Sequence, residues 1–407
     1  MKDSILILRL SRLGRIPPAL FSAELIQESG LPVLVVEFGN LKESKKTVKD
    51  KIEKIRFDAP WARWVPKKFQ LPTLLVWVTL ALCSRFILEG RPKILVAHGL
   101  AEQLMAWVLS KLFWIPLVIH AHEVYNPNDI EGAFSQFLLR IEKLVYKSAQ
   151  FVIFPEKKRA ELYRERYQFK GPIFIAANTP RWVPLPKPRD LRKAYQLSSQ
   201  SVLMGYMGGI GPTNFFENAI QALSFHPSLV FLVWGWGERK YIDQLTSLAH
   251  CLGVAERFLY LGQLNEDKLE SLAGCDFSYC VYQPHLLRTQ HQATASNKFF
   301  EAMAAGIPSV ISSNPDFYQF NRQNPVGVCA KTLTTEGVSE ALQSLVADPA
   351  FRKRLGMNAR KVFESGFHYE HQFFKPLQAF QDLYYGYPEI WSQEHIYFPP
   401  EQLPKAA

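Results

Sequence analysis

The chain has few of the features that are typical of a secreted protein, of a fold stabilised by a bound metal, or of a membrane-spanning protein. It has five cysteines, an odd number without any C-x-x-C pair, which argues against a disulfide framework or a zinc ribbon and favours a reducing compartment. The apolar run near the N-terminus is too short for a signal peptide. The longest apolar stretch, Leu71–Cys83, has about thirteen residues where a membrane span needs roughly 20, so we expect a buried helix there.

Acidic residues are also in deficit, because the formal net charge is +10. Such a balance favours anionic partners, yet no zinc-finger, RNP or recognition-helix signature points to nucleic acid. The excess is concentrated in the segment Lys42–Phe69, where tryptophans are interleaved with the lysines. This combination is typical of a segment that binds an anionic membrane surface. The alternative is a solvated loop whose aromatic side chains pack on the core.

A length of 407 residues predicts two or three domains. Short apolar runs alternate with helical stretches from the start: the first strand is expected at Ile5–Leu8, a helix at Ala19–Ser29 and the second strand at Val33–Val36. This β-α-β order predicts an α/β fold with a parallel sheet that is covered on both faces.

The best domain boundary lies where four prolines fall within nine residues, at Pro180, Pro184, Pro186 and Pro188. Closely spaced prolines make a stiff, extended linker. We therefore expect a first Rossmann-like domain over residues 1–180, a linker over 181–200, a second Rossmann-like domain over 201–370, and a crossover helix with a tail over 371–407.

A glycine-rich turn that includes Gly208 and Gly209 is expected in the second half, after an apolar strand and before a helix. Glycine lets the backbone approach a ligand closely, and a following helix presents free N–H groups to a phosphate. This turn is therefore a candidate phosphate-binding element.

A strand at 117–119 runs directly into His120, His122 and Glu123. Polar residues at the carboxyl end of a parallel strand are where α/β folds place ligand chemistry. Two alternatives stay open. The cluster could bind a metal, although it lacks the helical pairing of H-E-x-x-H, or the histidines could be structural.

The most informative stretch is SNKFFEAMAAGIP, residues 296–308. Ser296 or Asn297 can cap the start of a helix, and Gly306 followed by Pro308 marks its end. Lys298 and Glu301 are three residues apart and therefore share a face near the positive end of the helix. A cation, a carboxylate and free N–H groups suit a phosphorylated ligand with hydroxyls, whereas the alternative is an ordinary surface ion pair.

This stretch resembles the block (S/P)-N-K-(L/F)-(F/Y)-E-x-M-A-A-G-x-P of bacterial, retaining, nucleotide-sugar-dependent glycosyltransferases of the family-4 type. The run His120–Glu123 similarly resembles the D-A-H-E block of that family, with His120 where aspartate is frequent. The resemblance implies the GT-B fold: two Rossmann-like domains that face each other across a cleft, with a C-terminal helix crossing back to the N-terminal domain.

The resemblance also implies roles for single residues. Glu301 would contact the ribose of the donor nucleotide, the backbone at Leu264 its base, and His122 with Glu123 the transferred sugar or the acceptor. The donor-binding set implied in this way is Gly208, Gly209, Gly235, Gly237, Leu264, Ser296, Asn297, Lys298 and Glu301. Within this set, Gly235 and Gly237 resemble the family's G-x-G turn that follows a strand near the donor.

In the family an arginine and a lysine usually bind the diphosphate, whereas this chain has Gly209 and Asn214 at those two positions. Lys298 and Arg288 are the remaining candidates to balance that charge. Ala293 stands where many members carry a second glutamate, which leaves the sugar-hydroxyl contact unassigned.

The activity implied is transfer of a sugar, with retention, from a nucleotide-diphosphate sugar to a hydroxyl acceptor such as a lipid-linked glycan or a cell-surface polysaccharide precursor. No metal cofactor is expected, and the enzyme would be cytoplasmic or peripheral on the inner face of the membrane. One alternative is a catalytically degenerate protein that binds nucleotide or carbohydrate without turnover. Another is a nucleotide-sugar epimerase, against which the 296–308 block argues.

Overall fold

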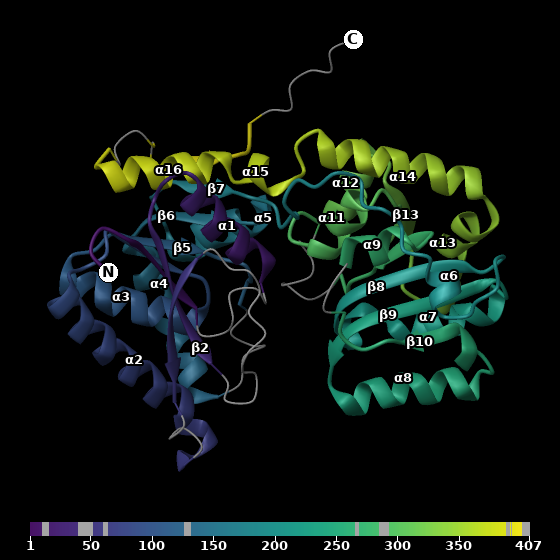
Figure 1. The fold of residues 1–407 in the computed structure, drawn as a ribbon, viewed down its shortest axis with the longest axis horizontal. Helices are drawn as coiled ribbons and strands as arrows, with labels where there is room; N and C mark the ends of the chain where they lie inside the picture. Colours follow the sequence, from purple (N-terminus) through teal and green to yellow (C-terminus); the bar gives the residue numbers. More distant parts are fainter. Residues whose placement is uncertain are drawn as a thin grey trace, which may run out of the picture. The chain divides into compact units, whose positions relative to one another are not determined.

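The structure, a computed structural model, describes residues 1–9, 16–39, 52–59, 64–125, 132–264, 268–284, 293–387, 391 and 393–400. These residues form two compact units, each with its own core (Figure 1). The first unit comprises residues 1–177 and the segment that begins at Tyr369, and the second comprises residues 178–368. Each unit is described by itself below.

The first unit is built on an eight-stranded sheet in the order β14-β7-β6-β5-β4-β1-β2-β3, in which every neighbouring pair is parallel. The central strands are apolar runs that are buried on both faces, as a parallel sheet covered by helices requires, whereas the edge strands β3 and β14 are partly exposed. Their bounds are β1 Ile5–Arg9, β2 Val33–Gly39, β3 Glu53–Asp58, β4 Ile94–Ala97, β5 Leu117–His120, β6 Ala149–Phe154, β7 Ile173–Ile175 and β14 Ile396–Tyr397.

Helices connect these strands and cover the sheet (Figure 1). They are α1 Pro17–Glu28, α2 Lys67–Glu89, α3 Leu100–Phe113, α4 Ala133–Lys147, α5 Lys157–Tyr167, α15 Tyr369–Gln372 and α16 Phe374–Tyr385. The last two return from the end of the second unit and complete the core of the first, where Tyr369, Phe373 and Phe380 are buried. A C-terminal helix that joins the first unit agrees with the GT-B expectation.

The second unit contains a six-stranded sheet in the order β10-β9-β8-β11-β12-β13, which is again parallel throughout. Its strands are β8 Val202–Ile210, β9 Leu229–Gly237, β10 Phe258–Tyr260, β11 Phe277–Cys280, β12 Ser309–Ser312 and β13 Gly327–Ala330. The helices around it are α6 Leu191–Ala194, α7 Phe216–Ala222, α8 Arg239–Cys251, α9 Lys268–Ala273, α11 Asn297–Ala304, α12 Pro315–Gln323, α13 Thr335–Ala347 and α14 Pro349–Glu364, with short 3-10 turns η4 Pro212–Asn214, η5 Leu223–Phe225 and η6 Ala255–Arg257.

Several helices of the second unit begin where the sequence supplies a capping side chain. Asp190, Thr334 and Asp348 accept hydrogen bonds from backbone N–H groups in the first turns of α6, α13 and α14. Such caps satisfy N–H groups that have no partner inside the helix.

The segment 181–200, expected as a linker, belongs to the second unit. Leu191 is buried in a core cluster of that unit, and Arg360 Nη2 donates to the Val183 carbonyl at 2.6 Å. The prolines therefore give the segment an extended path along the surface of the second unit.

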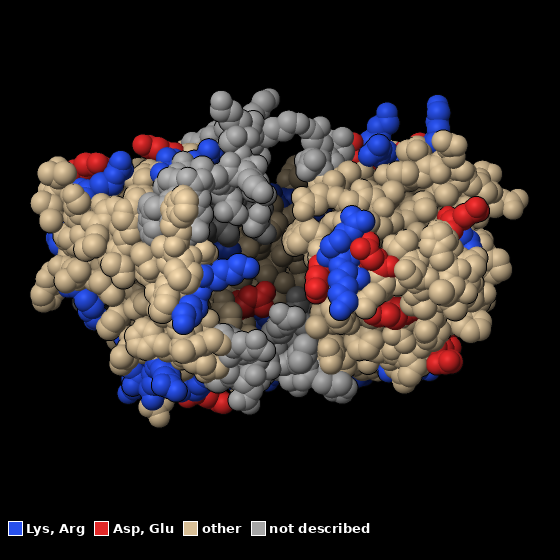
Figure 2. Space-filling model, turned by 90° about the horizontal axis from the view of Figure 1, so that it is seen from below, with Lys and Arg blue, Asp and Glu red and all other residues tan. Residues whose placement is uncertain are grey.

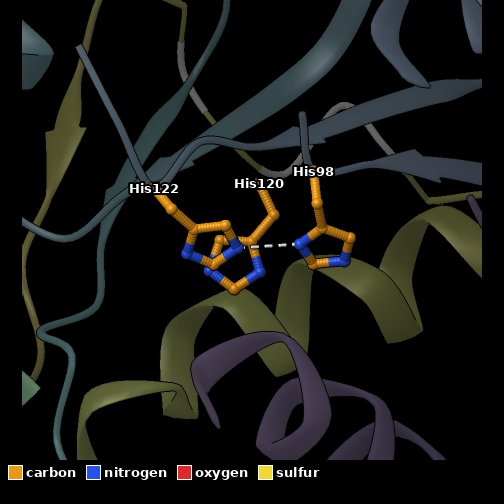
Figure 3. A group of neighbouring side chains, drawn as sticks. All are labelled: His98, His120 and His122. Atoms are coloured by element: carbon orange, nitrogen blue, oxygen red, sulfur yellow. Dashed lines mark hydrogen bonds between the residues drawn. The ribbon is translucent and has the colours of Figure 1, made fainter. Parts of the chain in front are cut away.

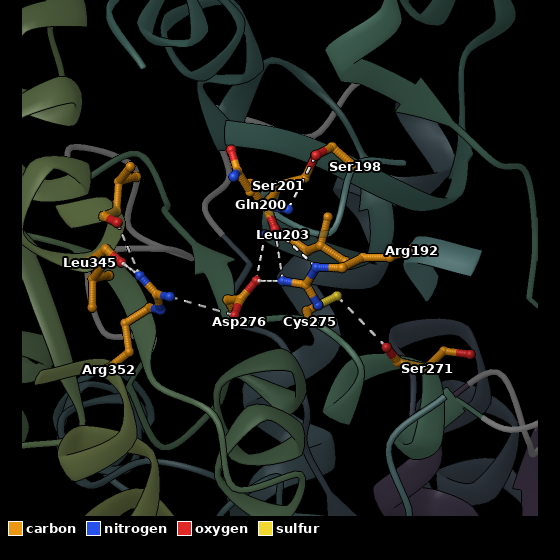
Figure 4. Close-up of polar contacts among 11 residues, drawn as sticks. Arg192, Ser198, Gln200, Ser201, Leu203, Ser271, Cys275, Asp276, Leu345 and Arg352 are labelled. Atoms are coloured by element: carbon orange, nitrogen blue, oxygen red, sulfur yellow. Dashed lines mark hydrogen bonds and ion pairs between the residues drawn. The ribbon is translucent and has the colours of Figure 1, made fainter. Parts of the chain in front are cut away.

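A polar cluster around Asp276 holds the start of this unit together (Figure 4). Its carboxylate accepts from Arg192 Nη2 at 2.5 Å and from the Leu203 backbone at 2.7 Å, and it lies 3.7 Å from Arg352 Nη2. Asp276 thus connects α6, β8 and α14 just before its own strand begins. Truncating one partner of such a network leaves a charge without its counterion, which is costly when the site is shielded from water.

The stretch Leu71–Cys83 is not the buried helix that the sequence predicts. It lies within α2, which has 23 residues and is long and apolar enough to cross a membrane. Only 22% of the most apolar 18-residue stretch of this helix is buried in the structure. The apolar run continues past Ser84 and Arg85 into Phe86 and Ile87, so counting the uninterrupted run underestimated the helix.

The basic segment Lys42–Phe69 lies partly outside the described residues. Its described parts include β3, which the sequence did not predict, and the first residues of α2. On the face drawn in Figure 2, basic and acidic side chains occur in small separate groups and most of the surface is uncharged. The basic side chains of the described residues are therefore not gathered into one large area on that face.

Glu142 is a carboxylic acid in the interior of the first unit. It is 1% exposed on α4, accepts a hydrogen bond from the Tyr167 hydroxyl, and lies among the rings of Tyr146 and Tyr163. Burial raises the pKa of Glu142 to about 7, although the hydrogen bond from Tyr167 and the charge of Arg166 oppose this shift.

We expect Glu142→Gln to become more stable relative to wild type as the pH rises. The folded state binds the Glu142 proton more tightly than the unfolded state, so wild type loses stability between pH 4.5, the ordinary value, and about 7. The difference in the free energy of unfolding between variant and wild type should grow between these pH values to at most about 3 kcal/mol and stay constant at higher pH. Calorimetric unfolding at several pH values measures it.

Glu161→Gln on α5 is the matched control. The pKa of Glu161 is lowered, because the effect of its partial burial is outweighed by the hydrogen bond from Lys158 together with the charges of Lys158 and Lys157. The Glu161→Gln variant should not become more stable relative to wild type as the pH rises. A Glu142→Gln profile parallel to the wild-type profile would contradict the prediction.

Candidate functional site

The strand order places polar residues at the carboxyl edge of the first sheet. The chain runs outward from β1 through β2 to β3, and outward on the other side from β4 through β5 to β6. Ligands of open α/β sheets bind beyond the carboxyl ends of the strands where the order reverses in this way. Here Arg9 ends β1, His98 follows β4 and His120 ends β5.

His98, His120 and His122 come together at this edge (Figure 3). His98 and His122 meet edge to edge, with 2.8 Å between His98 Nδ1 and His122 Nε2 and an angle of 6° between the ring planes. The His120 ring lies beside both, with its centroid 4.4 Å from that of His122 and 5.0 Å from that of His98. All three are buried, being 2–6% exposed.

The three histidines are held in their neutral form. Burial lowers the pKa of His120 to about 3 and lowers the pKa values of His98 and His122 well below 6.5, and the positive charge of Arg9 adds to the shift of both. Arg159 fixes the position of His122, because its Nη1 donates to the His122 carbonyl at 2.8 Å.

Two buried ring nitrogens, His98 Nε2 and His122 Nδ1, have no hydrogen-bond partner among the described residues. A neutral pair that shares one proton keeps an N–H on one outer nitrogen and a lone pair on the other. The group can therefore donate one hydrogen bond to a ligand and accept another without changing its charge.

The same group is the one set of histidine, cysteine and acidic side chains, within the part of the chain that the structure describes, whose donor atoms are close enough to share a metal ion. These atoms lie within 4.8 Å of one another. Neutral imidazole is the ligand form that zinc requires. An ion between His98 Nδ1 and His122 Nε2 would have to replace their hydrogen bond.

The sequence named His120, His122 and Glu123 at this edge and missed two other residues. His120 and His122 lie inside the histidine group, whereas Glu123 is exposed and is not part of it. His98 and Arg9 were not predicted, although each stands at the end of an apolar strand. That position was the available signal, but only the strand order shows that β1, β4 and β5 are neighbours.

In the second unit the predicted glycine turns are strand ends. β8 continues through Gly208 and Gly209 to Ile210, and β9 continues through Gly235 to Gly237, with Gly208 paired to Gly235. A Cβ atom on Gly235 would lie 1.8 Å from the Gly208 carbonyl oxygen, so the glycines allow two strands to approach each other closely. The interpretation of these residues as turns was therefore wrong.

Lys298 lies where the strand order of the second sheet reverses, between β8 and β11. Its Nζ donates to the Tyr206 hydroxyl at 3.0 Å and stands over the rings of Tyr206 and Tyr282, 4.6 and 4.8 Å from their centroids. A Cβ atom on Gly208 would be 3.3 Å from the Lys298 side chain. Two aromatic rings thus hold the ammonium group at the carboxyl edge of the sheet, and Gly208, which has no side chain, leaves room for the lysine beside it.

Asn214, which stands where the family has a basic residue, has a structural role. It is 5% exposed, its Oδ1 accepts from Tyr206 at 3.3 Å, and its Nδ2 donates to the Val281 carbonyl at 3.1 Å. The same Tyr206 hydroxyl donates to the Gly209 carbonyl. Asn214 therefore orders the Tyr206 side chain on which Lys298 rests.

The helix that begins the 296–308 block has the ends that the sequence predicts. Ser296 caps α11 by accepting from the Phe299 backbone at 3.3 Å, and its hydroxyl lies 2.7 Å from that of Tyr282. Gly306 has φ = 72°, the left-handed conformation that ends a helix, and β12 follows at Ser309. Residues Phe299 to Ala304 of this helix are buried.

Glu301 is 6% exposed on α11 and is paired with a residue that the sequence did not suggest. Its Oε1 lies 2.5 Å from Nζ of Lys268, the first residue of α9, while its Oε2 is buried without a partner among the described residues. A buried acceptor of this kind is available to a ligand hydroxyl. No sequence pattern links Lys268 to Glu301, since 33 residues separate them.

The remaining predicted positions contribute in different ways. Leu264 is half-buried beside the core cluster that contains Trp234, and Ala293 is buried with its N–H donating to Asp316 at 3.2 Å. Asn297 is half-buried at the first position of α11. Arg288 lies outside the described residues.

Two family models match the chain, and together they span most of it. Residues 22–178 match the glycosyl transferase 4-like domain, and residues 188–362 match the glycosyl transferases group 1. The first match falls in the first unit apart from its last residue, and the second falls within the second unit.

Individual relatives agree with these matches. The chain is 26% identical over 161 residues to the lipopolysaccharide core biosynthesis glycosyltransferase LpsE of Rhizobium meliloti (strain 1021). That alignment covers 40% of this chain and 44% of the relative, so it spans less than half of either protein.

Solved structures show the same fold at low identity. Sucrose-phosphate synthase from Thermosynechococcus elongatus has a TM-score of 0.74 at 16% identity, covering 94% of this chain and 100% of that chain. Anabaena HepE in complex with UDP and glucose has a TM-score of 0.71 at 17% identity, with the same coverage.

We expect the three histidines to stay neutral on mild acidification. Because their pKa values are lowered, the ¹⁵N resonances of their rings should not show the protonation shift between pH 8 and pH 5.5. Long-range ¹H–¹⁵N spectra of histidine-labelled protein measure this. His98→Asn, His120→Asn and His122→Asn assign the signals, and a midpoint near 6.5 for any of the three would contradict the prediction.

Proposed function

This chain is a glycosyltransferase of the family-4 type with the GT-B fold, and on that premise we propose that it moves a sugar, with retention, from a nucleotide-diphosphate sugar to a hydroxyl acceptor. The two family models and the structural neighbours carry the premise. The donor, the acceptor and the stereochemistry are parts of the proposal.

The observation that carries the proposal is the pair of groups on the first two turns of α11. Lys298 presents an ammonium at the carboxyl edge of the second sheet, and one turn further along Glu301 presents a carboxylate oxygen that has no partner among the described residues. A nucleoside diphosphate has both complementary parts, because its phosphates are anionic and its ribose carries two adjacent hydroxyls. We assign the phosphates to Lys298 and the ribose to Glu301.

Departure of the nucleotide leaves negative charge on the diphosphate while positive charge develops on the sugar. Fixed dipoles and cations at the leaving group stabilise this charge most effectively when they need no reorganisation. Lys298, held between two tyrosines, and the N-terminal N–H groups of α11 beside Ser296 meet this requirement. The strand ends at Gly208 and Gly209 leave room for the diphosphate beside them.

We assign the transferred sugar and the acceptor to the histidine group of the first unit. His122 and His98 are neutral at physiological pH, so they would orient hydroxyls through one donor and one acceptor nitrogen without adding charge. This proposal routes no step through a metal ion.

The acceptor that we propose is a lipid-linked glycan or the precursor of a cell-surface polysaccharide. The relative from Rhizobium meliloti acts, by its name, in lipopolysaccharide core biosynthesis, and this supports an acceptor of the same class. The enzyme would then work at the cytoplasmic face of the membrane that carries its acceptor.

The second candidate is a degenerate protein that binds a nucleotide or a carbohydrate without turnover. Gly209, Asn214 and Ala293 replace groups that the family uses on the diphosphate and the sugar, and Asn214 is fully occupied by structural contacts. Turnover of donor decides between the two candidates.

We expect one nucleoside diphosphate among UDP, GDP and ADP to raise the melting temperature of the protein, and Glu301→Ala to abolish the rise. A ligand at 100 times its dissociation constant contributes about 2.7 kcal/mol to the unit that binds it, which is a shift of several degrees. The structure containing UDP and glucose makes UDP the first candidate. Calorimetry with and without EDTA should give the same shift.

Glu340→Ala, an exposed glutamate on α13, is the matched control and should keep the full shift. A shift that survives Glu301→Ala would remove Glu301 from the nucleotide site. The absence of any shift in the wild type would reject the proposed donor class.

We expect Lys298→Met to weaken the binding of the nucleoside diphosphate about tenfold or more, and to leave binding of the nucleoside alone unchanged. Hydrogen bonds between charged groups contribute roughly 1.5–3 kcal/mol, and only the diphosphate carries the charge that Lys298 would meet. Isothermal titration with both ligands measures the difference. Lys353→Met, an exposed lysine on α14, should bind both as wild type does, and an equal loss for both ligands in Lys298→Met would indicate damage to the site instead.

A further inference from the structure

The helix α2 is apolar on two opposite sides. Its inner side packs on the first unit through Leu75, Val78, Leu82 and Phe86, which are at most 4% exposed. A helix on the surface of a soluble domain normally has a polar outer side. The outer side of α2 instead carries large apolar residues, which is the strongest unexplained feature of the described surface.

Four of these residues define what we call the α2 outer face: Phe69, Val76, Leu80 and Ile87. They are 52%, 61%, 63% and 75% exposed. Their spacings of seven, four and seven residues place them along one side of a helix, over a length of about 27 Å. The α2 outer face is therefore an apolar ridge along one side of the helix, with the small polar residues Thr73 and Ser84 in the turns between its members.

The end of α3 lies beside the end of α2 and also exposes apolar side chains. The rings of Phe86 and Phe113 are in contact, with centroids 5.1 Å apart, and Arg91 Nη1 donates to the Phe113 carbonyl at 2.5 Å. At this end of α3, Leu112 and Trp114 are 61% and 86% exposed. At the other end of α2 stands Trp64, 79% exposed.

Basic residues flank both ends of the ridge. Lys67 and Lys68 are exposed at the start of α2, and Arg91 and Lys111 are exposed at its end. The one acidic residue in the sequence of α2, Glu89, is within 4.0 Å of both the N-terminal amine and Arg85. The charge around the ridge is therefore positive, and this complements an anionic partner and disfavours a second copy of the same face.

We propose that the α2 outer face docks on a lipid bilayer that carries anionic headgroups, with α2 lying in the plane of the membrane surface. Apolar side chains would enter the boundary between headgroups and acyl chains, the lysines would meet the headgroup phosphates, and Trp64 and Trp114 would occupy the interfacial layer.

Although α2 is long enough to span a bilayer, its inner side is occupied. Leu75 packs with Ala101 of α3 and Leu138 of α4, and the Trp77 ring contacts Phe57 of β3 with centroids 5.5 Å apart. Crossing the membrane would remove these contacts, whereas lying on its surface preserves them. The docking surface thus differs from the basic segment that the sequence suggested, and it overlaps that segment only at its end, where Trp64, Lys67, Lys68 and Phe69 lie.

Flotation of the full-length protein with vesicles tests the proposal without donor or acceptor, so its outcome does not depend on the proposed transfer activity. Wild type should float with vesicles of phosphatidylcholine mixed with phosphatidylglycerol, and less with phosphatidylcholine alone. The double variant Val76→Gln/Leu80→Gln should bind about tenfold more weakly or worse, because it removes two apolar side chains from the contact.

Both substituted side chains are exposed, so the melting temperature of the double variant should equal that of wild type. The matched control is Phe225→Gln/Met357→Gln, which replaces two apolar side chains of similar exposure in the second unit and should float as wild type does. Lys67→Gln and Lys68→Gln should each weaken binding to the anionic vesicles about fivefold at low salt.

Three results would overturn the proposal. Wild type could fail to float with anionic vesicles, or the double variant could float as well as wild type. The third is a wild-type protein that elutes as a dimer while Val76→Gln/Leu80→Gln elutes as a monomer, which would assign the ridge to a second copy of the chain.

Discussion

Parallel strand pairing is the constraint on which both units depend. In a parallel sheet every strand ends at the same edge, and every connection must return across a face of the sheet, which buries the strands completely. The functional groups consequently gather at one edge of each sheet. Where the strand order reverses, between β1 and β4 and between β8 and β11, the connections leave in opposite directions and the edge stays open to a ligand.

The chemistry at the two edges differs in charge. The first unit presents imidazoles that burial keeps neutral, whereas the second presents an ammonium and a carboxylate one helical turn apart on α11. At the second edge, Asn214 and Tyr206 form a scaffold that holds Lys298 in place.

The sequence predicted the elements that depend on local patterns and missed those that depend on distant partners. The ends of α11 follow from Ser296 and Gly306, and the buried strands follow from their apolar runs, because these signals lie within a few residues. Lys268 beside Glu301, and His98 beside His122, are contacts across many residues that no local pattern contains. The glycines at 208 and 235 were predicted to form turns. The sequence alone does not distinguish a glycine that lets two strands approach closely from a glycine that a turn requires. The exposed side of α2 was missed because an apolar run does not tell which of its sides is covered.

The first unit is completed by the last part of the chain. Tyr369, Phe373 and Phe380 fill its core, and β14 extends its sheet, so the second unit is an insertion between two pieces of the first. During synthesis the first 177 residues therefore emerge from the ribosome without the side chains that close their core. Translation of the intervening residues takes roughly 10 to 40 s at ordinary rates of 5–20 residues per second. The inserted unit has all of its strands by then and can fold first, while the first unit waits with an incomplete core that a chaperone would recognise.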